Sequence, residues 1–94
     1  MTTTAITTIV ERPDVLLSLA RLVEEQIHNV NQVQAKFKAG LYVDHDSYEC
    51  DLEDAQDAHI IACVAYKAAM QLIKGKRIND EQTSALKSAL HVAL

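Results

Sequence analysis

The sequence predicts an all-α domain of three helices, built on a long antiparallel helical hairpin. Three observations predict it. Apolar residues recur at steps of three and four through residues 14–39, alanines fill the middle of the next segment, and glycines or capping residues stand where each periodic stretch ends. Of the 94 residues, 49% are apolar and 23% are charged, a balance that supports a folded core. With two glycines, one proline and no tryptophan, the chain lacks the turn residues of a β-sandwich and the stacking platform of a single-strand nucleic-acid binder.

The N-terminal segment is rich in threonine, isoleucine and valine, which disfavour a helix. We expect residues 1–12 to form a flexible arm, and a short β pairing with residues 41–43 is the alternative. The arm has neither the basic start nor the continuous apolar stretch of a secretory signal, and no apolar run approaches the ~20 residues of a membrane span. We therefore expect a cytoplasmic protein in which Cys50 and Cys63 are free thiols.

The first helix is predicted over residues 14–39. Pro13 has the fixed φ that suits a first helical turn, and Asp14 complements the helix dipole. Gly40 is the natural residue to follow the last turn. The apolar seam of this helix consists of Leu16, Leu19, Val23, Val30, Val33 and Phe37.

The second helix is predicted over residues 47–74, with Asp46 as its cap, Glu49 completing a capping box and Gly75 ending it. Its middle is apolar on nearly every side, which is typical of a helix that several neighbours bury. The first helix and a short third helix do not suffice to cover this surface. We therefore expect a homo-oligomer, most simply a dimer, that supplies the remaining cover. The residues expected at the centre of that interface are Ile61, Ala65, Ala68 and Leu72.

The third helix is predicted over residues 80–93. Asn79 can cap it, and Gln82 stands at the position from which its side chain can return the hydrogen bond. A stripe of alanine and leucine gives this helix a face that can dock on the hairpin. All three helices belong to one predicted domain over residues 1–94.

Charge is distributed unevenly along the chain. The net charge is −4, yet residues 39–66 carry −7 with no Lys or Arg, whereas residues 67–94 carry +3. Acids at a helix start favour the helix dipole and keep a loop soluble, which accounts for three or four of the seven. A partner-binding acidic face is the second interpretation of this segment. The seven carboxylates are Asp44, Asp46, Glu49, Asp51, Glu53, Asp54 and Asp57.

Calcium binding is the first metal chemistry that the sequence suggests and then excludes. Asp44-x-Asp46 begins like an EF-hand loop. The fifth, sixth and twelfth positions, however, hold Tyr48, Glu49 and Ala55 in place of the required residues.

Other metal and catalytic patterns are also weak. His59 and Cys63 share a helical face and, with Cys50, could bind a soft metal, but the paired ligands of a structural zinc site are absent. Glu25 and His28 have the spacing of a di-iron motif but fall opposite the apolar seam. No glycine-rich phosphate loop or nucleophile elbow occurs. We therefore expect neither enzymatic activity nor a cofactor.

The sequence thus predicts a non-catalytic, cytoplasmic interaction or regulatory protein that acts through its helical surface. The basic cluster of Lys74, Lys76 and Arg77 coincides with a helix C-terminus, and the pI is about 5.4, which argues against direct nucleic-acid binding. One alternative is an acidic inhibitor, of the kind phages and mobile elements encode, that occupies a basic nucleic-acid-binding surface of a host or defence protein. Another is a small metal or redox protein that uses Cys50, His59 and Cys63.

Overall fold

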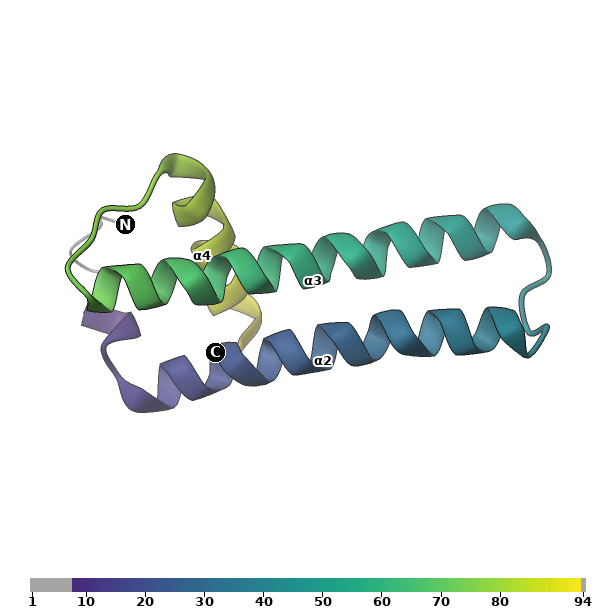
Figure 1. The fold of residues 1–94 in the computed structure, drawn as a ribbon, viewed down its shortest axis with the longest axis horizontal. Helices are drawn as coiled ribbons and strands as arrows, with labels where there is room; N and C mark the ends of the chain where they lie inside the picture. The colour runs from purple at the N-terminus through teal and green to yellow at the C-terminus, as the bar shows by residue number, and fades with distance from the viewer. Residues whose placement is uncertain (1–7, 94) are drawn as a thin grey trace.

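Three helices form most of the computed structural model, which describes residues 8–93. Helix α2 spans Pro13–Lys38, α3 spans His45–Ile73 and α4 spans Asp80–Ala93. No strand occurs among the described residues, so the all-α prediction is confirmed, and each helix lies within two residues of its predicted range. Figure 1 shows α2 and α3 side by side along the long axis, joined at one end by the loop 39–44. Within residues 8–93, no helical segment has the uninterrupted apolar length that a bilayer crossing requires.

The long helices end where the backbone enters the left-handed region. Gly40 (φ 72°) follows α2 and Gly75 (φ 79°) follows α3, and glycine adopts this conformation without the steric cost of a Cβ. At the start of α4, Asn79 Oδ1 accepts a 2.8 Å hydrogen bond from the Gln82 N–H, and Gln82 Oε1 accepts one of 2.9 Å from the Asn79 N–H. This reciprocal pair is the capping box that the sequence predicts.

The start of α3 differs from the prediction. Asp44, rather than Asp46, is the N-cap: its Oδ1 accepts a 2.6 Å hydrogen bond from the Ser47 N–H. Asp44 has the extended backbone that a cap requires, whereas Asp46 already lies in the first helical turn. Glu49 does not return a hydrogen bond to the cap. Its Oε1 lies 2.9 Å from Nε2 of His45 instead.

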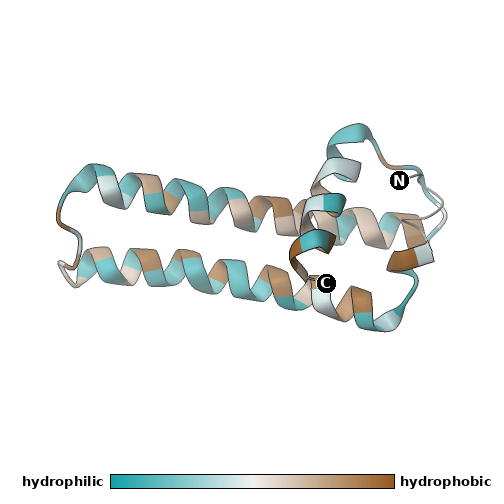
Figure 2. Ribbon diagram, turned by 180° about the vertical axis from the view of Figure 1, so that it is seen from behind, coloured by the Kyte–Doolittle hydropathy of each residue, from teal (hydrophilic) through white to brown (hydrophobic). Residues whose placement is uncertain are grey.

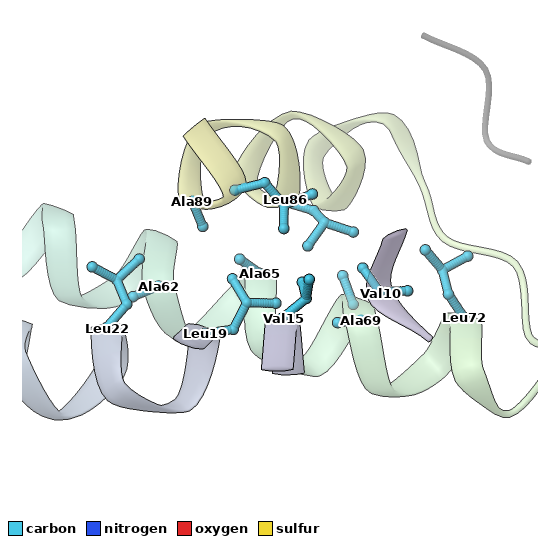
Figure 3. Close-up of a cluster of buried hydrophobic side chains, with 12 residues drawn as sticks. Val10, Val15, Leu19, Leu22, Ala62, Ala65, Ala69, Leu72, Leu86 and Ala89 are labelled. Carbon is cyan, nitrogen blue, oxygen red and sulfur yellow. The ribbon is translucent and has the colours of Figure 1, made fainter. Parts of the chain in front are cut away.

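The core lies at one end of the molecule, where α4 crosses the other two helices (Figure 2). Side chains from all three helices meet there (Figure 3). Helix α3 contributes mainly alanines, whose small side chains let both neighbouring helices approach closely. The buried cluster consists of Val10, Val15, Leu19, Leu22, Ala62, Ala65, Ala68, Ala69, Leu72, Leu86, Ala89 and Leu90.

The prediction of a flexible arm over residues 1–12 is wrong for the last part of that range. Residues 8–10 form a helical turn, and Val10 is 0% exposed in the core, with Ile9 partly buried beside it. The burial of apolar side chains outweighs the weak helix propensity of β-branched residues. Residues 41–43, the alternative β partner, form no strand. The remainder of the predicted arm, residues 1–7, lies outside the described residues.

Candidate interaction surface

An aromatic cluster closes the end of α2 and α3 that lies away from the core. Phe37 stacks on Tyr48 with ring centroids 4.0 Å apart, and Tyr42 meets Tyr48 edge-on at 5.5 Å. The His45 ring lies 5.9 Å from the rings of both Phe37 and Tyr48. These contacts join the two helices and their loop where α4 gives no support. The sequence analysis missed this cluster, although three of the four aromatic residues of the chain fall within residues 37–48.

All seven predicted carboxylates are exposed. Three have partners, because Asp44 caps α3, Glu49 lies beside His45, and Asp51 accepts a 3.0 Å hydrogen bond from the Tyr42 hydroxyl. The other four side chains make no hydrogen bond or ion pair with any residue in the range 8–93. These four are Asp46, Glu53, Asp54 and Asp57.

Four carboxylates form an acidic ridge along α3, which we define as Asp46, Glu49, Glu53 and Asp57. Residues three or four positions apart share one face of a helix, so these side chains follow each other turn by turn. Half-buried Tyr48 and its stack on Phe37 mark the opposite side, where α3 meets α2. The acidic ridge is therefore accessible over about three turns.

Two groups in the loop that joins α2 and α3 have a shifted pKa. Hydrogen bonds from the backbone N–H and then the side chain of Ser47 lower the pKa of Asp44. Desolvation, followed by the hydrogen bond and the negative charge of Asp51, raises the pKa of Tyr42. Both shifts come from local contacts that hold the loop 39–44 and the first turn of α3 in place.

We expect the start of α3 to be acid-sensitive. Because the pKa of Asp44 is lower in the folded chain, its capping contribution is present above the unfolded pKa of about 3.9 and is lost as the pH falls through the folded value. Asp44→Asn keeps an acceptor but removes this titration, so the response of the α3 start to acid in this range should be smaller than in the wild type. The Cα chemical shift of Ser47, followed during acid titration, measures this. An Asp44→Ala variant with an unchanged Ser47 shift at neutral pH would contradict the assignment of the cap.

Three of the four residues predicted to join two copies lie inside the core of this chain. Ala65 and Ala68 are fully buried and Leu72 is nearly so. The reason is that α4, although short, crosses the alanine face of α3 and supplies the cover that the sequence analysis assigned to a second copy (Figure 3). These three residues cannot face a second copy while the core is intact. Ile61 remains 43% exposed.

An apolar groove of about 290 Å³ lies beside Ile61, between α3 and α4. A second hollow of about 180 Å³ continues toward α2 and shares Ile61 and Ser88 with the first. The groove begins one helical turn after Asp57, so the acidic ridge leads directly into it. The residues that line the groove are Ile60, Ile61, Val64, Glu81, Ser84, Ala85 and Ser88.

The three residues of the metal or redox alternative do not form one group. Cys50 and Cys63 are free thiols on one helix, about 20 Å apart at 1.5 Å per residue. An intrachain disulfide would require Cα atoms within about 7 Å. His59 and Cys63 do touch, with Nε2 and Sγ 3.5 Å apart, as helical neighbours one turn apart do. Among the described residues, no three side chains of metal-binding type form a group.

The cations lie toward the other end of α3. Lys67 lies on α3, whereas Lys74, Lys76 and Arg77 follow its last residue, and all four are exposed, so charge changes from acidic at the start of α3 to basic in the segment after its end. Glu25 and His28 are exposed on α2, and His28 Nε2 lies 3.0 Å from Nε2 of Gln32.

No family model, curated protein or solved structure matches this chain.

Proposed function

We propose that this chain is a non-catalytic interaction protein that engages the basic surface of a partner through its acidic ridge and the adjoining groove. The scaffold is an antiparallel hairpin of α2 and α3 with α4 docked across it. One observation carries the proposal: three of the four carboxylates of the acidic ridge, Asp46, Glu53 and Asp57, are exposed and make no hydrogen bond or ion pair within residues 8–93, in a segment without Lys or Arg. The cap, the helix dipole and solubility of the loop account for three or four of the seven carboxylates, so the others are not explained by stability.

The two parts of this surface have different roles. A row of like charges creates a local potential that steers a basic partner and raises the association rate. Exposed Ile60 and Ile61 in the groove supply apolar area whose burial holds the complex together. Val43, which is 98% exposed in the loop, adds an apolar contact at the free end of the hairpin. Such a regulator needs no cofactor, and we place it in the cytoplasm, where its two thiols stay reduced.

The acidic inhibitor is a narrower form of the same proposal. In that form the basic surface of the partner is one that binds nucleic acid, and the acidic ridge competes for it. Addition of DNA or RNA to the complex distinguishes the two forms, because nucleic acid displaces the inhibitor but not a regulator bound elsewhere.

Reversal of two charges in the acidic ridge tests the proposal. We expect Glu49→Lys combined with Glu53→Lys to abolish partner binding, because the two lysines would face a basic surface. Wild-type binding should weaken steeply as salt rises, since exposed charges are screened over about 10 Å at 0.1 M. A lysate pull-down eluted with a salt gradient, followed by titration of the identified partner, measures both effects.

The matched control carries the same change of charge on α2. Glu24→Lys combined with Glu25→Lys alters two exposed residues away from the acidic ridge and should leave binding nearly intact. Circular dichroism tests whether both double variants remain helical, as we expect. If both double variants lose binding equally, or if binding does not change with salt concentration, the acidic ridge does not bind the partner and its carboxylates are only a solvated helix start.

A further inference from the structure

A regular pattern of charge runs along the free side of α3. Five residues follow one another at intervals of seven, four on α3 and the last at its C-cap, and we call them the heptad stripe: Asp46, Glu53, Ile60, Lys67 and Lys74. Seven residues are nearly two helical turns, so the five side chains point within about 40° of one direction. All five are exposed, Ile60 to 58%. Along the stripe, two acids precede one apolar residue and two bases follow it.

Neither α2 nor α4 buries the heptad stripe, although Ile60 faces α4 across the groove. Tyr48 stacks on Phe37 on the side that meets α2, and Ala65 and Leu72 lie in the core that α4 covers. The ion pairs found within residues 8–93 are Arg12–Asp14 and His45–Glu49. The four charges of the stripe thus have no ion pair within that range.

We propose that a second copy of this chain pairs with the heptad stripe, with the two α3 helices antiparallel and a two-fold axis at Ile60. In this arrangement Ile60 meets the Ile60 of the partner subunit. Glu53 then lies opposite Lys67 of the partner subunit, because both are seven residues from Ile60. Asp46 lies opposite Lys74 of the partner subunit, at fourteen residues on either side. The two-fold axis repeats each contact, which gives four ion pairs between the copies.

Charge complementarity selects both the orientation and the partner. A parallel pair would place Glu53 against Glu53 and Lys67 against Lys67, which is repulsive at every charged position. When two stripes run antiparallel, every acid of one stripe lies opposite a base of the other, and Ile60 lies opposite the Ile60 of the partner subunit. An unrelated partner would not require this symmetry, whereas a second copy does.

Apolar contact at the centre supports the same arrangement. Ile60 lines the groove of about 290 Å³ together with Ile61 and Val64, so an isoleucine from the second copy has apolar side chains to pack against. The heptad stripe extends over about 42 Å of helix at 1.5 Å per residue. A contact of this length and one helix width is at the small end for stable complexes. The dimer should therefore dissociate on dilution and at high salt.

This inference deepens the proposed function and rests on it, since it names a second copy as a basic surface that the acidic ridge engages. Glu53 and Asp46 belong to both the acidic ridge and the heptad stripe. A heterologous partner would compete with dimer formation for these two residues, so the dimer would be the stored form of the regulator.

Complementary charge reversals test the proposal with the purified chain alone, kept reduced. Glu53→Lys makes positions 53 and 67 both positive, and Lys67→Glu makes positions 53 and 67 both negative. At a concentration and low salt where the wild type is dimeric, each variant alone should be monomeric, with the dissociation constant raised at least tenfold. The equimolar mixture should recover a dimer, because every pair then joins opposite charges. The double variant Glu53→Lys with Lys67→Glu should also recover it.

The control moves the same charges elsewhere on the molecule. Glu24→Lys and Lys87→Glu change exposed residues of α2 and α4 outside the stripe, and neither should alter the dimer. Sedimentation velocity over a wide dilution series measures the masses, and circular dichroism tests whether each variant is folded.

Two results would overturn the inference. One is a wild-type mass of a single chain throughout the dilution series at low salt. The other is a mixture of Glu53→Lys and Lys67→Glu that associates no better than either variant alone. A monomeric chain that still captures a basic partner in a salt-dependent way removes the dimer and leaves the proposed function standing. If the chain neither forms a dimer nor captures a basic partner, both the dimer and the proposed function are wrong.

Discussion

Replacement of Leu86 by alanine is expected to lower the free energy of unfolding by about 2–5 kcal/mol. Leu86 comes from α4, is 0% exposed and lies among side chains of all three helices (Figure 3). Its neighbours on α3 are alanines, which have no spare length to fill the space that leucine leaves. The cavity should therefore persist and the cost should fall in the upper part of that range. Because each kcal/mol lowers the melting temperature of a domain of this size by about 4–8 °C, the melting temperature should fall by roughly 15–40 °C.

The matched control is Val92→Ala on the same helix. Val92 is 68% exposed, so its truncation removes little buried surface. Thermal and urea unfolding, followed by circular dichroism, measure both variants. Similar melting temperatures for Leu86→Ala and the wild type would mean that α4 does not dock through this face.

The helix limits could be predicted from the sequence because they depend on local chemistry. Pro13 starts α2, Gly40 and Gly75 take the left-handed conformation that ends α2 and α3, and the Asn79 cap pairs with Gln82. Each of these effects acts within about four residues along the chain. A pattern of that range can be recognised without knowledge of the tertiary structure.

Other features depend on contacts that no local pattern reports. Val10 lies in a segment of poor helix formers, yet its burial is determined by the space that the three helices leave. The choice between Asp44 and Asp46 as cap depends on the backbone angles of the loop, which is itself held by the aromatic cluster of Phe37, Tyr42 and Tyr48. The angle at which α4 crosses α3 decides which alanines are covered.

The candidate surface could be predicted only in part, because its charges follow from the sequence but its limits depend on tertiary contacts. Exposure of the seven carboxylates follows from their charge, because burial of unpaired carboxylates is costly. The heptad stripe requires knowledge of which side of α3 remains uncovered, and periodicity alone does not decide it. A helix with apolar side chains on nearly every side indicates that several neighbouring helices cover it, but it does not indicate whether those helices belong to the same chain.

Substitution of Ala65 by leucine tests whether the helices that cover α3 belong to the same chain or to a second copy. Ala65 is 0% exposed where α3 approaches both neighbouring helices, so three additional carbon atoms have no space. We expect the variant to lose about 1–3 kcal/mol of unfolding free energy through overpacking, independently of protein concentration. Ala35→Leu, at an exposed position of α2, is the control, since alanine and leucine have similar helix propensities. If Ala65 instead lay between copies, the substitution would change the mass measured by sedimentation while the monomer kept its stability. An unchanged melting temperature of dilute Ala65→Leu would therefore contradict the placement of α4 over the alanine face, and a fall in that temperature assigns the face to the core of a single chain.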